Sequence, residues 1–116
     1  MSEMKKIFTS NSMAPVGPYS QAVQVGNHIF VSGQIPADKN GNLVEGSIAD
    51  KTKASCEGMK AILEEAGSSI GKVIKDFAEM NGMYEQYFSH KPARSCVAVK
   101  ELPKGVPVEI EAIALS

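Results

Sequence analysis

The stretch PARSCVAVKELPKGVPVEIEAIA, residues 92–114, decides the fold. Apolar side chains recur at alternate positions on both sides of a turn at residues 102–105, which is typical of strands whose successive side chains point to opposite faces. Residues 95–99 and 107–115 are therefore predicted to be strands. The second strand has one apolar face, formed by Val108, Ile110, Ala112 and Ala114. Its opposite face carries Glu109, Glu111, Ile113 and Leu115.

The N-terminal third predicts more of the same sheet. Residues 22–25 and 28–32 are short apolar runs separated by Gly26-Asn27, a pair that favours a tight hairpin turn. A further strand is predicted over residues 4–9. Residues 11–18 (NSMAPVGP) contain two prolines and a glycine, and they are predicted to form a loop.

Two helices are predicted between these groups of strands. Ser47-Ile48-Ala49-Asp50 forms a capping box, and Gly67 is suited to close the helix that follows. An apolar stripe along this helix comprises Ile48, Thr52, Cys56, Met59, Leu63 and Ala66. The second helix is predicted over residues 76–88. The order of strands, helices and strands predicts a single α+β domain, residues 1–116, with helices on one face of a mostly antiparallel sheet.

Composition narrows the function classes. The 116 residues carry a formal net charge of −1 without a basic run, which argues against a nucleic-acid partner. No segment approaches the ~20 apolar residues that span a membrane, so no membrane partner is expected. Cys56 and Cys96 lie far apart, outside any CxxC motif or His/Cys cluster, so neither a disulfide nor a zinc site is predicted. The N-terminus MSEMKKIFTS resembles neither a signal nor a transit peptide, which favours the cytoplasm, with the mitochondrion as the alternative.

Arg94 and Glu109 are the candidate reactive pair, because the pattern places them on strands expected to be neighbours. Each has two interpretations. Arg94 is either a solvated residue at a strand end, the commoner case for arginine, or a clamp whose planar guanidinium binds both oxygens of a carboxylate. Glu109 is either an exposed strand residue or a general acid/base that orients water.

The other candidates have ordinary structural interpretations beside functional ones. Cys96 is by default a small buried hydrophobe, and no histidine in its neighbourhood suggests a nucleophile. Tyr19 is either a packed loop aromatic or a ligand contact. Ser32 and Gly33 end a strand, where a hydroxyl and exposed backbone could meet a ligand. Asn81 falls within a predicted helix, where a surface position is the simplest explanation.

Four segments together resemble the Rid family, also called the YjgF family: GPYSQA (17–22), FVSGQIP (30–36), DFAEMN (76–81) and residues 92–114. The resemblance covers nearly the whole chain. It implies a chorismate-mutase-like fold, a mixed sheet backed by two helices, assembled as a homotrimer with clefts between subunits. It also implies hydrolysis of enamine and imine products of pyridoxal-phosphate-dependent dehydratases, such as 2-aminoacrylate and 2-iminobutanoate, to 2-keto acids and ammonia. No cofactor or metal is implied.

The resemblance also implies roles for individual residues. Arg94 would bind the substrate carboxylate, and Glu109 would orient or activate water near the imine carbon. The main chain at Cys96 would contact the substrate, without its thiol attacking. Other positions would line the cleft, with the tyrosine reaching in from a neighbouring subunit and the glycine permitting close backbone approach: Tyr19, Ser32, Gly33 and Asn81.

Two other functions are compatible with the same resemblance. One is a trimer that binds 2-keto acids without turnover and serves a regulatory purpose. The other is an endoribonuclease or translation inhibitor, an activity also attributed to the family. The near-neutral charge and the lack of an aromatic, basic platform argue against RNA as a substrate.

The sequence departs from the family pattern between the two predicted helices. A strand of the form K-x-x-x-F-L-x-D-M is expected there, whereas Ile74 runs directly into Lys75 and Asp76. The sequence therefore predicts that about one strand, ~5–10 residues, is absent and that a short loop joins the helices. A truncated variant, a divergent member with a compensating arrangement, and residues missing from the written sequence are the competing explanations. Loss of the strand would expose sheet edges.

Overall fold

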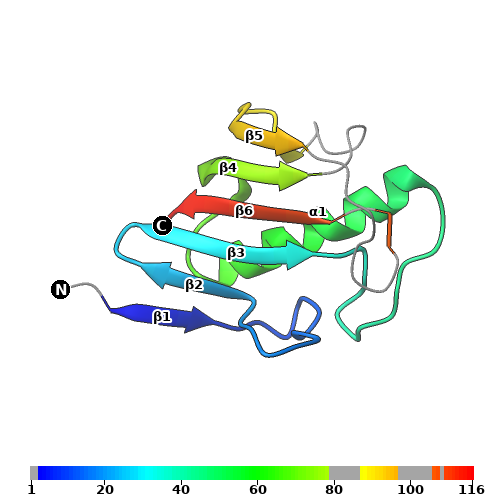
Figure 1. The fold of residues 1–116 in the computed structure, drawn as a ribbon, viewed down its shortest axis with the longest axis horizontal. Coiled ribbons are helices and arrows are strands. Elements are labelled where there is room, and N and C mark those ends of the chain that lie inside the picture. The colour runs from blue at the N-terminus through cyan, green and yellow to red at the C-terminus, as the bar shows by residue number, and fades with distance from the viewer. Residues whose placement is uncertain (1–2, 79–86, 97–105, 108) are drawn as a thin grey trace.

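The computed structural model describes residues 3–78, 87–96, 106–107 and 109–116. One six-stranded sheet has the order β1-β2-β3-β6-β4-β5 (Figure 1). Neighbouring strands are antiparallel except β4 and β5, which run parallel, so the sheet is mixed as predicted. The elements are β1 (Met4–Ile7), β2 (Ala22–Val25), β3 (His28–Gln34), α1 (Ile48–Glu65), a 3-10 turn (Ile70–Lys72), β4 (Val73–Ala78), β5 (Ala93–Cys96) and β6 (Ile110–Leu115).

The core lies between α1 and one face of the sheet. Figure 1 shows α1 running behind the sheet, across its central strands. Alternation on β6 is confirmed, because Ile110, Ala112 and Ala114 are buried while Glu111 and Leu115 are exposed. The apolar stripe of α1 is also buried, except that Ile48 is exposed at the first turn and Ala66 is half-buried. The opposite face of the sheet is not covered by any described helix.

Both predicted ends of α1 are confirmed. Asp50 N donates to Ser47 Oγ at 3.1 Å, and Ser47 N donates to Asp50 Oδ2 at 3.0 Å, which completes the capping box. At the other end Gly67 adopts a φ of 79°, a left-handed conformation that glycine takes without a steric cost. Gly67 N donates to Glu64 O and Ser68 N donates to Leu63 O, which is the Schellman pattern.

The prediction of a helix beginning at Asp76 is wrong. Residues 76–78 belong to strand β4, which pairs with β6 on one side and with β5 on the other. If the chain formed a helix from Asp76, strands β5 and β6 would lose their backbone hydrogen-bond partners in β4. Pairing between strands therefore outweighs the local helical pattern. Residues 79–86, which contain most of the predicted second helix, lie outside the described residues.

The expected loss of a strand between Ile74 and Lys75 is wrong in that form. Strand β4 runs through both residues, and a register shift places Val73 opposite Ala114 and Lys75 opposite Ile113. Ile74 is therefore the extra residue of a bulge. A strand is therefore present at this place. It is β4, and it includes residues 76–78, which the local pattern had predicted to be helical.

Other boundaries differ by a few residues. Strand β3 extends to Gln34, two residues beyond its predicted end, and β6 begins at Ile110 rather than at residue 107. Strand β5 begins at Ala93, and the predicted continuation to residue 99 lies outside the described residues. In the described part of the chain, no helix is long and apolar enough to cross a membrane.

The capping box predicts a pH-dependent contribution to stability. Hydrogen bonds from the Ser47 backbone and side chain hold the pKa of Asp50 below its usual 3.8. A carboxylate with a lowered folded-state pKa stabilises the fold above its unfolded pKa, and this stabilisation is lost as the pH falls through the folded pKa. Asp50→Asn should therefore unfold at a lower temperature than the wild type at pH 7, with the gap closing below about pH 3.8. Thermal unfolding monitored by circular dichroism across this range checks it, and a gap independent of pH would contradict it.

Candidate functional site

Strand β3 leaves its regular pairing with β6 at Ser32 and Gly33. Val31 pairs with Ala112 and Gln34 pairs with Ile110, and the register shifts between these two pairs. The irregularity releases the backbone of the two intervening residues from the β3–β6 ladder, so other groups can reach it. Ser32 and Gly33, which the sequence nominated as a ligand-facing strand end, thus lie at a break in the centre of the sheet.

Internal hydrogen bonds fix all three polar groups of Ser32. Its Oγ donates to Ser20 O at 2.6 Å, and its N donates to Gln21 O at 2.9 Å. Its carbonyl oxygen accepts from Gln34 Nε2 at 3.0 Å. Because the hydroxyl proton is committed to Ser20, the free capacity of Ser32 Oγ is that of an acceptor. The sequence could not predict this direction.

The Glu109 carboxylate lies directly against Gly33. A Cβ added to Gly33 would be 2.6 Å from Glu109 Cδ and 2.6 Å from its Oε2. No side chain fits in that space, so glycine is required for the carboxylate to rest on the backbone of β3. Glu109 is half-buried and comes immediately before β6. The close backbone approach predicted for Gly33 is thus used by a glutamate of the same chain.

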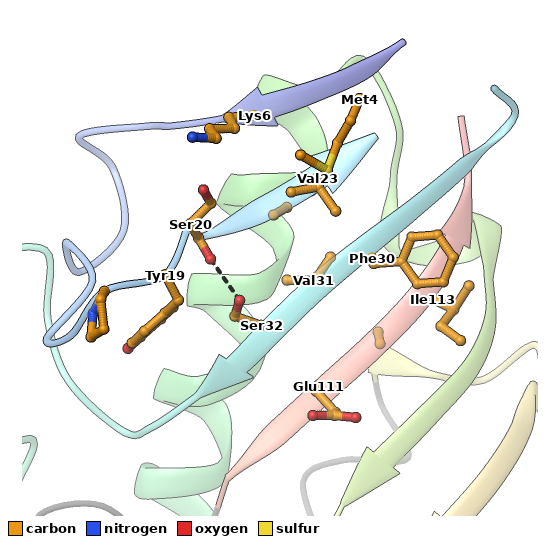
Figure 2. Close-up of a pocket in the computed structure, with 13 residues that line it drawn as sticks. Met4, Lys6, Tyr19, Ser20, Val23, Phe30, Val31, Ser32, Glu111 and Ile113 are labelled. Atoms are coloured by element: carbon orange, nitrogen blue, oxygen red, sulfur yellow. Dashed lines mark hydrogen bonds between the residues drawn. The ribbon is translucent and has the colours of Figure 1, made fainter. Parts of the chain in front are cut away.

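A hollow of about 690 Å³ lies on the sheet face opposite α1. Its lining includes two predicted site residues, Tyr19 and Ser32, beside Glu111. Figure 2 shows Tyr19, Ser20 and Ser32 gathered at one end, with Phe30 and Ile113 at the other. The Tyr19 side chain is 44% exposed, and its hydroxyl accepts from Val16 N at 3.3 Å. Tyr19 is therefore a loop residue presented at the surface and not a packed core aromatic.

Arg94 is exposed on β5, but the expectation that its strand neighbours the strand of Glu109 is wrong. Strand β4 lies between β5 and β6, which separates their backbones by about 10 Å. In register, Arg94 aligns with Asp76 and Asp76 with Ala112, which faces α1. Glu109 lies three positions before Ala112, an odd number, so strand alternation directs it to the opposite face of the sheet. The described part of one chain therefore does not place these two residues on neighbouring strands.

The remaining predicted residues are placed only in part. Cys96 ends β5 opposite Ala78, and Asn81 lies outside the described residues. His90 Nε2 lies 2.9 Å from Val73 O at the start of β4, which gives this histidine a structural contact. Among the described residues, no cluster of three His, Cys, Asp or Glu side chains could hold a metal ion.

Sequence reasoning missed two buried glutamines that organise this region. Gln21 and Gln34 are 2% and 8% exposed, and both hydrogen-bond to loop and strand backbone around Ser32. Each stands inside a quoted motif, GPYSQA or FVSGQIP, without having been given a role. The available signal was a long polar side chain just before one apolar strand (Gln21) and at the end of another (Gln34), since buried amides need partners.

Comparisons with known proteins find similarity along almost the whole chain. The family model described as Endoribonuclease L-PSP matches residues 9–116. A RutC family protein of Pyrococcus abyssi is 52% identical over 119 residues, covering 93% of this chain and 94% of the relative. The 2-iminobutanoate/2-iminopropanoate deaminase of Escherichia coli is 43% identical over 124 residues, covering 96% of this chain and 97% of the relative.

Two crystal structures share the fold. The yeast protein YEO7 superposes with a TM-score of 0.94 at 41% identity, covering 98% of this chain and 99% of the yeast chain. Escherichia coli TdcF with bound serine superposes with a TM-score of 0.88 at 37% identity, covering 97% and 98% of the two chains. These matches confirm the predicted α+β fold class.

The comparisons also bear on the departure from the family pattern. The Pyrococcus alignment spans 119 positions but covers 93% of 116 residues, or about 108, so about 11 positions of the relative lack a counterpart here. The chain is therefore shorter than this relative within the aligned region, while strand β4 is retained. With a matching family model over residues 9–116 and relatives this close, the chain belongs to the Endoribonuclease L-PSP family, the YjgF or Rid family that its motifs resemble.

Proposed function

We propose that this protein hydrolyses short 2-imino acids, such as 2-iminobutanoate and 2-iminopropanoate, to 2-keto acids and ammonia. The observation that carries the proposal is the Glu109 carboxylate resting on the Gly33 backbone, at the break in the sheet beside Ser32. The name of the 43% identical Escherichia coli relative supports the same chemistry. The bound serine of the TdcF structure supports a ligand with one carboxylate on a small carbon skeleton.

The proposed reaction needs positioning and proton transfer. Glu109 orients a water molecule and accepts its proton as the oxygen bonds to the imine carbon. That proton then passes to the imine nitrogen, which gives a carbinolamine. The remaining hydroxyl proton moves to the same nitrogen through Glu109, the C–N bond breaks, and ammonia leaves as the carbonyl forms. A carboxylate fixed against backbone suits this role, because general-base catalysis depends first on reach and orientation.

Arg94 is proposed to bind the substrate carboxylate, and Ser32 to contact the reacting end. A guanidinium offers parallel donors that match both carboxylate oxygens. Since Ser32 Oγ already donates to Ser20 O, it accepts from the imine N–H or from the attacking water. Tyr19, Asn81 and the main chain at Cys96 are proposed to complete the cleft.

We further propose that the complete site forms between copies of the chain in a homotrimer. Within the described part of one chain, β4 separates the strands of Arg94 and Glu109, which supports a site that draws residues from two copies. The sheet face opposite α1 carries exposed apolar side chains, including Phe30 at 44% and Leu115 at 42% exposure. Exposed apolar side chains on one sheet face favour burial against another subunit. Tyr19 would reach in from the neighbouring subunit.

The family description also raises ribonuclease activity as a second candidate. RNA binding normally depends on lysine and arginine neutralising phosphates. Here the net charge is −1, and Glu109, just before β6, and Glu111, within it, would repel a phosphate backbone. Imine hydrolysis therefore fits the described surface better than RNA cleavage does.

Replacing Arg94 tests the proposed function. Wild-type protein should accelerate ammonia release from 2-iminobutanoate generated by threonine dehydratase. Arg94→Ala should lower kcat/KM by about 100-fold, because hydrogen bonds to a charged group are lost, and Arg94→Lys should fall between the two. Equal acceleration by wild type and Arg94→Ala would contradict the clamp. RNA cleavage that survives loss of both Arg94 and Glu109, without imine hydrolysis, would favour the ribonuclease.

Gly33→Ala tests whether the contact between the Glu109 carboxylate and the Gly33 backbone matters for the reaction. The new Cβ would require Glu109 to move, since 2.6 Å is far inside van der Waals contact. Turnover at saturating imine should fall at least about tenfold, because the water-orienting group is displaced. The control is Gly71→Ala, where the nearest side-chain atom is 4.0 Å from the added Cβ. Wild-type turnover in Gly33→Ala would show that the position of Glu109 is not important for the reaction.

A further inference from the structure

A buried amide anchors the loop that carries Tyr19. The Gln21 side chain is 2% exposed, and its Oε1 accepts from Thr9 N at 2.7 Å. Its Nε2 donates to Thr9 O at 3.1 Å and to Met13 O at 2.9 Å. Both donors and one acceptor position of the amide are therefore used. These bonds hold residues 9–13 against the start of strand β2.

The backbone beside this amide holds the end of β3. Gln21 O accepts from Ser32 N at 2.9 Å, and the preceding carbonyl of Ser20 accepts from Ser32 Oγ. Residues 20 and 21 are thus bonded through their backbone to Ser32, while the Gln21 side chain is bonded to the loop. One residue joins two walls of the candidate site.

The hydrogen bonds described within residues 14–19 are local. Tyr19 N donates to Gly17 O at 2.9 Å, and Val16 N donates to the Tyr19 hydroxyl. Pro15 and Pro18 have no N–H to donate. Such bonds shape the loop but do not place it on the sheet. Its placement depends on the anchors at its two ends, of which Gln21 makes the most side-chain bonds.

Glutamine is the side chain that this position needs. A methionine of similar length would fill the space and leave one N–H and two carbonyl groups without their partner, which is costly for buried groups. A glutamate would still accept from Thr9 N, but its ionised carboxylate would face the carbonyl oxygens of Thr9 and Met13. The position is therefore sensitive to hydrogen-bonding capacity and not merely to size.

We propose that Gln21 is a positioning residue for substrate binding: it holds Tyr19 and Ser32 at a fixed spacing without touching the substrate. The proposal rests on the proposed function, because it takes Tyr19 and Ser32 as binding residues. It extends that function by naming a buried residue outside the cleft that sets the affinity of the site. Glu109 rests on Gly33 through a separate contact, and Ser32 is bonded to backbone oxygens of residues 20 and 21, so replacing the Gln21 side chain displaces chiefly the loop that carries Tyr19.

The test compares Gln21→Met with Ile62→Val, a core change in α1 at a fully buried position outside the candidate site. For each protein, the melting temperature, the dissociation constant for 2-ketobutanoate and the turnover at saturating 2-iminobutanoate are measured. Gln21→Met should weaken 2-ketobutanoate binding about tenfold while turnover stays within about threefold. Ile62→Val should lower the melting temperature and leave the binding constant unchanged.

Gln21→Glu supplies a second readout, and it decides the matter if Gln21→Met does not fold. Protonation of the new carboxyl restores one donor, so binding relative to wild type should recover as the pH falls, with no such recovery in Gln21→Met. Unchanged binding in folded Gln21→Met, or a Gln21→Glu defect independent of pH, would overturn the proposal. A wild type that binds 2-ketobutanoate without turnover refutes the deaminase but leaves the Gln21 comparison valid. A wild type that does neither overturns both proposals.

Discussion

The ladder between β3 and β6 is the constraint on which the rest of the structure depends. Strand β6 pairs with β3 on one side and β4 on the other, so its register orders both halves of the sheet. One face of β6 packs against α1 and forms the core. The break in the same ladder at Ser32 and Gly33 admits the Glu109 carboxylate. Packing and the candidate site thus derive from one pair of strands.

The local sequence pattern correctly predicted the features that depend only on residues close together in the chain. The capping box at Ser47, the glycine end at Gly67 and the alternation on β6 are confirmed because each depends on neighbouring residues alone. The order of strands is not local. Strand β4 lies between the strand of Arg94 and the strand that follows Glu109. Asp76 is in a strand because β4 pairs with a neighbour on each side.

The same contrast between local and long-range features explains which site residues could be predicted from the sequence. Ser32 and Gly33 stand at a strand end, where a polar residue and a glycine are visible in the sequence. The glycine's partner, Glu109, lies 76 positions away, so its contact with Gly33 could not be read from either segment. Gln21 was missed for a related reason: its partners are backbone groups of Thr9 and Met13, which carry no residue-type signal.

The proposed chemistry explains why the structure relies on fixed geometry. An imine carbon is already electrophilic, so a water held at the right place and a carboxylate to move protons are sufficient, and effective concentration provides the rate. Such a site is specified by spacing between rigid groups. The described interactions are of that kind: a glycine that leaves room for a carboxylate, a serine whose proton is committed to the backbone, and a buried amide that joins a loop to a strand. In a reaction that depends on spacing, the residues that support the site are therefore as important as those that contact the substrate.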